Sequence, residues 1–211
     1  MARASRSSPG DPAPPIRSLD GLADAAQSCT ACPLYANATQ AVFGEGAAHA
    51  SIVMIGEQPG DAEDKAGHPF VGPAGGVLDK ALAEARIDRQ EVYLTNAVKH
   101  FKWEPRGRWR IHKKPRVSEI KACKPWLEAE LTRIKPRVIV CLGTTAVQSL
   151  LGSKVTIASA RNQVLESAFG PVIVTRHPSS VLRMHESRER RAALDELVAD
   201  LRRARALIAK S

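Results

Sequence analysis

Four short runs of β-branched and apolar residues recur along the chain, and each ends in a loop rich in glycine, asparagine, histidine or proline. The runs cover residues 51–55, 92–95, 137–142 and 172–175. Runs of this length without polar alternation are typical of strands covered on both faces, as in a parallel sheet. We therefore predict a mostly parallel central sheet of four strands.

Helical periodicity fills the segments between these runs. The expected helices cover residues 18–27, 75–85, 118–134, 144–151 and 186–209. Alternating strands and helices indicate an α/β fold, here a three-layer αβα sandwich with right-handed crossovers. Ligands of such sheets bind beyond the carboxyl ends of the strands. The loops at residues 56–76, 96–114 and 177–183 should therefore form one functional rim.

Residues 1–17 carry prolines, serines and arginines without an apolar period, so we predict a flexible tail. The remaining 18–211 suit a single domain. No apolar run approaches the roughly 20 residues that cross a membrane. The first residues lack the apolar core of a secretory signal. We expect a cytoplasmic monomer with no membrane span.

Basic residues outnumber acidic ones by 31 to 22, which gives a formal net charge of +9. A surplus of this size indicates a polyanionic partner, nucleic acid first and an anionic membrane second. The charge is concentrated between Lys99 and Arg116, where eight Lys or Arg residues accompany one acid, Glu104. Phe101, Trp103 and Trp109 interleave with them. Such a segment suits phosphate neutralisation and base stacking, although a merely solvated face is the alternative.

Four cysteines are a second constraint, because disulfides are rare in a reducing cytoplasm. Cys29 and Cys32 form a chelating Cys-x-x-Cys pair, whereas Cys123 and Cys141 are 18 residues apart. A structural zinc site usually closes with a second tight pair. An iron–sulfur cluster accepts dispersed thiolates. The spacing leaves open a cluster, a zinc site, or inert core thiols at Cys123 and Cys141.

Three loops carry residues suited to chemistry. Glu57 and Asp61 follow the first strand, where a carboxylate can act as a base or stabilise charge. Phe70 lies in a glycine-rich loop that is not a P-loop, and it suits either the core or a stacking platform. His112 lies among cations that disfavour its protonated form. His177 begins the last loop, as a hydrogen-bond donor to a developing anion or as a structural His-Pro turn.

Taken together, these motifs resemble the uracil-DNA glycosylase superfamily, and within it the iron–sulfur branch. The matching residues are Cys29-x-x-Cys32, Gly56-Glu-Gln-Pro-Gly-Asp61, Pro69-Phe-Val-Gly-Pro-Ala-Gly75, Asn96, Cys123, Cys141 and His177-Pro-Ser179. Gln58 and the basic loop ending in His112 are similar to the UdgX subgroup, whose members become covalently joined to the abasic site. That subgroup's loop often has Lys-Arg-Arg-Ile-His, whereas Trp109 replaces a basic residue here.

The resemblance implies excision of uracil from DNA followed by covalent trapping through His112. Phe70 would stack on the extruded base, and Asn96 would pair with uracil O4 and N3–H. His177 would stabilise charge at O2, while Glu57 would stabilise the sugar or orient His112. Gln58 and Asp61 are placed in the same pocket. The expected DNA contacts are Lys99, Lys102, Arg108, Arg110, Lys113, Ser179 and Arg183.

The resemblance also implies a structural [4Fe–4S] cluster held by Cys29, Cys32, Cys123 and Cys141. Two other functions stay open. One is a hydrolytic iron–sulfur glycosylase that releases free abasic DNA, and the other is a catalytically silent metal-binding module for nucleic acid. Uracil release would distinguish either glycosylase from the silent module. A protein–DNA band that resists denaturation would distinguish the trapping glycosylase from the hydrolytic one.

Overall fold

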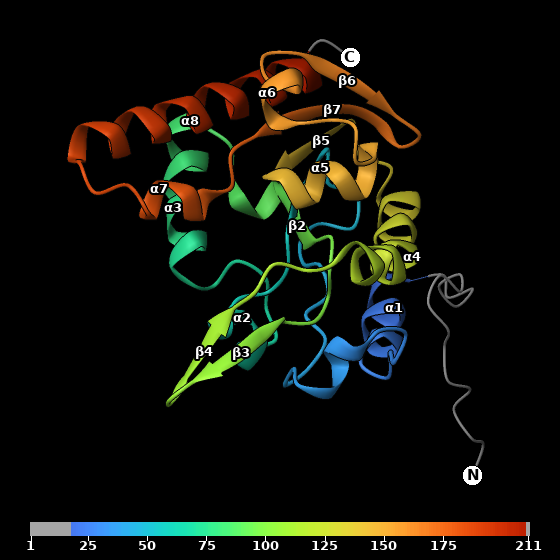
Figure 1. Ribbon diagram of the computed structural model, residues 1–211. Helices are drawn as coiled ribbons and strands as arrows, with labels where there is room; N and C mark the ends of the chain where they lie inside the picture. The colour runs from blue at the N-terminus through green and yellow to red at the C-terminus, as the bar shows by residue number, and fades with distance from the viewer. Residues whose placement is uncertain (1–17, 210–211) are drawn as a thin grey trace.

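The computed structural model of this protein describes residues 18–209, so the tail predicted at residues 1–17 lies outside the described residues. A five-stranded sheet forms the centre of the molecule (Figure 1). Its strands are β1 (Ile52–Gly56), β2 (Val92–Asn96), β5 (Val138–Leu142), β6 (Val164–Ser167) and β7 (Gly170–Thr175). They lie in the order β2-β1-β5-β7-β6.

The predicted α/β class with a mostly parallel sheet is confirmed, but the prediction of four strands is wrong. β2, β1, β5 and β7 are parallel, and β6 is a fifth strand that runs antiparallel at the edge beside β7. β6 has only four residues, which alternate between exposed and half-buried. It therefore lacks the continuous apolar run by which the other strands are recognised.

Helices cover both faces of the sheet. On one face α3 (Pro73–Ala85) and α8 (Ser187–Ala209) pack against Ile52 and Met54, and on the other α4 (Val117–Ile134) and α5 (Thr144–Leu151) pack against Val53 and Ile55. Consecutive residues of β1 thus enter opposite cores, which explains its unbroken apolar run. The shorter helices are α1 (Leu19–Ala26), α2 (Asp61–Ala66), α6 (Ile157–Ala160), α7 (Pro178–Leu182), and the 3-10 helices η1 (Pro33–Ala36) and η2 (Arg89–Glu91).

The basic segment, predicted as a loop, instead folds as a β-hairpin that projects from the body of the molecule (Figure 1). β3 (Trp103–Arg106) and β4 (Trp109–His112) pair in antiparallel register, with Arg106 opposite Trp109. Gly107 takes a φ of +58° in the two-residue turn, a conformation that suits glycine.

None of the helices in residues 18–209 is both long and apolar enough to cross a membrane.

Candidate active site

A cavity of about 740 Å³ opens where the carboxyl ends of the parallel strands meet the hairpin. The residues predicted for the site that line it are Glu57, Gln58, Phe70, Asn96, His112, His177, Ser179 and Arg183. The predicted functional rim therefore brings together side chains from three loops distant in sequence. We call Glu57, Asn96 and His177, which lie at or just after strand ends, the sheet wall. We call the β3–β4 hairpin, with His112, the hairpin wall.

Glu57 joins the two walls. Its Oε1 lies 3.3 Å from His112 Nε2, and its Oε2 accepts a short hydrogen bond from the Thr145 hydroxyl. Burial raises the pKa of the Glu57 carboxyl, but the hydrogen bonds from His112 and Thr145 outweigh it and leave the pKa below its ordinary value. Glu57 is thus a carboxylate held against the imidazole of His112. Half of the His112 side chain is exposed, so a ligand can reach its ring.

Asn96 and Phe70 are brought together by the absence of a side chain at Gly56. A Cβ on Gly56 would lie 2.3 Å from Asn96 Oδ1 and 2.8 Å from Phe70 Cζ. Phe70 adopts a φ of +57°, a left-handed conformation that costs a phenylalanine about 1 kcal/mol or more. Its ring lies 6.3 Å from the His177 ring with 26° between their planes. Such strain at a cavity wall is typical of a positioned functional side chain.

His177 is held as a neutral ring with a defined tautomer. Burial lowers its pKa to about 4. The backbone N–H of Ser179 donates to His177 Nδ1 at 3.2 Å, so Nδ1 acts as an acceptor. The proton of the neutral ring then resides on Nε2, which makes Nε2 a hydrogen-bond donor. Ser179 was predicted as a phosphate contact, and the structure shows that it also sets the orientation of His177.

Gln58 lines the cavity, but its amide is engaged by the base of the hairpin. Its Nε2 donates to the carbonyls of Lys102 and Lys113, and its Oε1 accepts from the Lys102 N–H. The side chain therefore pins the chain that enters β3 to the chain that leaves β4. That Gln58 contacts uracil stays a prediction, whereas the structure shows its hydrogen bonds to the base of the hairpin.

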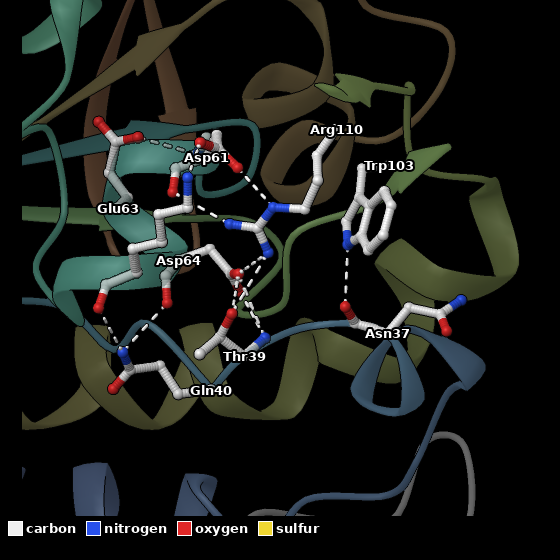
Figure 2. Close-up of polar contacts among 10 residues, drawn as sticks. Asn37, Thr39, Gln40, Asp61, Glu63, Asp64, Trp103 and Arg110 are labelled. Carbon is white, nitrogen blue, oxygen red and sulfur yellow. Dashed lines mark hydrogen bonds and ion pairs between the residues drawn. The ribbon is translucent and has the colours of Figure 1, made fainter. Parts of the chain in front are cut away.

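Arg110 clamps the hairpin to α2, as Figure 2 shows. Its guanidinium pairs with Asp61 at 2.5 Å and with the fully buried Asp64 at 2.6 Å, and it also donates to Thr39. Asp61 does not line the cavity, so its predicted place in the catalytic pocket is wrong. It belongs instead to the contact of Arg110 with Asp61 and Asp64, which we call the Arg110 clamp. The Arg110 guanidinium is paired with these two carboxylates and lies over the Trp103 ring. Most of its hydrogen-bond donors are therefore not available to DNA phosphates.

Lys99 corrects another prediction, because its ammonium is buried rather than offered to DNA. It pairs with Glu130 at 2.6 Å and donates to Thr95 and to the Asn96 carbonyl. Lys102 is mostly covered and paired with Glu119. Arg108, Lys113 and Arg183 are exposed, and they stay predicted DNA contacts.

Three of the four cysteines lie together, and the fourth does not. Cys29, Cys32 and Cys123 share a small core between α1 and α4. Burial raises the pKa of Cys123 to about 12, because it outweighs the lowering by the nearby Lys99 ammonium and the Lys99 N–H. Cys141 lies in β5 within the main core, opposite Ile55, so a set of four cysteines does not fit. In residues 18–209, no three potential ligand side chains are arranged to hold a single metal ion.

Sequence reasoning missed several residues around the cavity. Thr145, which binds Glu57, follows the glycine at the end of β5, and that position was the available signal. Asp64 was unremarkable in the sequence but is the buried anchor of Arg110. Lys114, Thr144 and Arg176 also line the cavity. For these last three residues and Asp64, only the close approach of separate loops in the structure identifies their role.

Comparisons with known proteins agree with this geometry. Residues 43–202 match the family described as the uracil DNA glycosylase superfamily. The chain therefore belongs to that superfamily, and the expected enzyme class, a DNA glycosylase, is confirmed. Among curated relatives, a type-4 uracil-DNA glycosylase of Thermotoga maritima is 39% identical over 181 residues, which cover 85% of this chain and 91% of the relative.

Two further relatives have similar names. A type-4 uracil-DNA glycosylase of Archaeoglobus fulgidus is 36% identical over 182 residues, covering 82% of this chain and 88% of its own. A type-5 uracil-DNA glycosylase of Pyrobaculum aerophilum is 30% identical over 149 residues, 62% of each chain. The similarity to these two type-4 proteins thus extends further along the chain than the similarity to this type-5 protein.

Proposed function

We propose that this protein excises uracil from DNA and then becomes covalently joined to the abasic sugar through His112. The observation that carries the proposal is the placement of His112 Nε2 3.3 Å from the Glu57 carboxylate, in the cavity that Asn96, Phe70 and His177 also line. A base-recognition set and a nucleophile with its own base thus share one cavity.

Excision begins with a uracil that is flipped out of a duplex or met in a single strand. Phe70 stacks on the base, and the Asn96 amide pairs with uracil O4 and N3–H, an edge that cytosine presents with reversed donors and acceptors. The bond between C1′ and N1 breaks, and its electron pair stays on uracil. His177 Nε2–H stabilises that charge at O2, which the tautomer set by Ser179 permits.

The covalent step uses the pair on the hairpin side. As the C1′–N1 bond breaks, His112 Nε2 forms a bond to C1′, and Glu57 accepts the proton that this nitrogen releases. The uracil anion takes up a proton from water, and Glu57 returns its proton to water. The net products are free uracil and a histidine–DNA adduct, with no oxidant or cofactor consumed.

A uracil-containing oligonucleotide tests this proposal directly. Wild-type protein should give a protein–DNA band that survives denaturation, and His112→Ala should lose it completely. His68→Ala is the matched control, because His68 is an exposed histidine paired with Glu45 outside the cavity. Circular dichroism verifies that each variant is folded.

The hydrolytic alternative fits the similarity to type-4 uracil-DNA glycosylases equally well. In that reaction Glu57 activates water, which attacks C1′ in place of His112. Uracil release by the wild type without any resistant band would establish this alternative and exclude trapping.

The three clustered cysteines support a structural [4Fe–4S] cluster as the cofactor. Cys29, Cys32 and Cys123 supply three thiolates, and His100 is our candidate for the fourth ligand in place of Cys141. His100 is buried, burial lowers its pKa so that the ring is neutral, and it follows Lys99, whose N–H donates to Cys123 Sγ at 3.2 Å. Such a cluster would join α1, α4 and the chain after β2.

Iron content and visible absorbance test this ligand set without relying on activity. Cys123→Ala and His100→Ala should lose iron, His100→Cys should retain it, and Cys141→Ala should leave it unchanged. A colourless protein that contains zinc, or equal loss of iron in Cys141→Ala, would contradict the assignment.

A further inference from the structure

The outer face of the hairpin carries an exposed aromatic ring that excision and trapping do not use. Strand side chains alternate, so Trp109 and Ile111 face away from Arg110 and His112 on β4. Trp109 is 62% exposed and Ile111 is 40% exposed. Within residues 18–209, the one ring or cation partner of Trp109 is Arg108, whose guanidinium lies 4.8 Å from the ring centroid.

Trp109 differs from the other two aromatics of the basic segment. Phe101 is buried at 1% exposure, and Trp103 donates from Nε1 to the Asn37 carbonyl at 2.8 Å on the inner face (Figure 2). Of the three aromatics that suggested base stacking, Trp109 is the only exposed one, since Trp103 is half-buried and Phe101 is buried. An exposed tryptophan at a projecting turn contributes nothing to the core, so its ring is available to a ligand.

The charge around Trp109 is positive. Arg106, its cross-strand partner, and Arg108 are both exposed, and in residues 18–209 neither forms an ion pair. The acid of this hairpin, Glu104, is engaged by Lys113 at 2.8 Å. An aromatic face between two arginines matches a nucleotide, because the ring stacks on the base and the guanidinium groups neutralise the adjoining phosphates.

The ring is also close to the reaction along the chain. Trp109 and His112 lie three residues apart on one strand, which corresponds to about 10 Å. A few nucleotides of an extended strand span that distance. A base inside a duplex is stacked on both sides and offers no free face, so a nucleotide that stacks on Trp109 has to be unpaired.

We propose that Trp109 is a stacking platform for an unpaired nucleobase a few nucleotides away from the target, and that the substrate is uracil in single-stranded DNA. This inference rests on the proposed function and specifies its substrate class. It assigns a positive role to the position where the resembling subgroup often carries a basic residue.

Fluorescence anisotropy with a labelled oligonucleotide that lacks uracil tests the platform, with the same sequence offered as a single strand and as a duplex at fixed salt. Trp109→Ala should weaken single-strand binding about tenfold, within the range for one stacked base, and should leave duplex binding unchanged. Trp109→Phe should restore most of the affinity. Val164→Ala, an exposed apolar residue on the distant edge strand β6, is the control and should have no effect.

The salt dependence separates stacking from charge. Trp109→Ala removes no cation, so the slope of log affinity against log salt should stay the same, whereas Arg108→Ala should reduce that slope by about one ion. Unchanged single-strand affinity in Trp109→Ala would overturn the proposal. The outer face of the hairpin would then be a candidate contact for a protein partner instead. Equal loss on single strand and duplex would overturn it as well.

Failure of this inference is distinguishable from failure of the proposed function. Uracil release with unchanged single-strand affinity in Trp109→Ala retains the glycosylase and rejects the platform. Conversely, a tenfold loss of single-strand affinity in a protein that releases no uracil retains the platform and rejects the substrate assignment.

Discussion

The two walls of the cavity are built in different ways. The sheet wall follows the ends of buried parallel strands, and beneath it the Lys99–Glu130 pair is sealed in the interior, with Glu130 also accepting from Tyr93 and Thr95. The hairpin wall is a two-stranded ribbon that is fastened by the Gln58 amide and by the Arg110 clamp. One wall depends on the core, and the other on a few polar contacts.

This difference suggests a division of labour under the proposed function. Base recognition and bond cleavage need positions that do not move, and the strand ends supply them. The histidine that would form the adduct lies on an element whose position can change while the sheet stays intact. Substitutions in the two walls should therefore separate excision from trapping.

The largest effect is expected beneath the sheet wall. Glu130→Leu leaves the Lys99 ammonium buried without its carboxylate, so the free energy of unfolding should fall by about 3–5 kcal/mol. Urea denaturation followed by circular dichroism measures it. The double variant Lys99→Met with Glu130→Leu removes both charges and should recover most of the loss. A decrease below about 1 kcal/mol in the single variant would mean that the pair behaves like a surface ion pair.

A smaller and more selective effect is expected at the hairpin wall. Arg110→Leu releases the clamp, so adduct formation should slow about 100-fold, the scale expected when a reacting group is misplaced. Uracil release should be retained, since the sheet wall is untouched. A time course of both products on the same oligonucleotide measures the separation. Lys65→Ala, which also removes a partner of Asp61, is the control, and parallel loss of both products in Arg110→Leu would refute the division.

The smallest effect concerns pH. The folded protein holds the pKa of His177 at about 4, below the ordinary 6.5, so between these values the unfolded chain binds a proton that the folded one does not. The free energy of unfolding should therefore fall by about 3 kcal/mol as pH drops through this window. The lowered pKa of Glu57 acts at more acidic pH, where its carboxylate becomes protonated and its stabilising bonds are lost.

Urea denaturation across that pH window measures the contribution of His177. His177→Gln should flatten the dependence, whereas His185→Gln, at an exposed histidine, should leave it as in the wild type. An unchanged slope in His177→Gln would show that the ring is not held neutral by burial.

Much of the architecture was predictable from local pattern, and the exceptions share a cause. The four parallel strands have continuous apolar runs, and α1 lies within the predicted helix over residues 18–27. The edge strand β6 was missed because half of its residues face solvent. The hairpin was missed because charge conceals its alternation of inward and outward side chains.

Among the site residues, the sequence by itself determined which side chains follow strand ends, since that order is local. It therefore placed Glu57, Asn96 and His177 on one rim. Only the tertiary structure decided which charges remain free. Lys99 and Lys113 are both lysines, but the Lys99 ammonium is paired with the buried Glu130 carboxylate of α4. Cys141 lies on β5 in the main core, away from the other three cysteines. Burial and pairing depend on segments far away in the chain, and no local pattern encodes them.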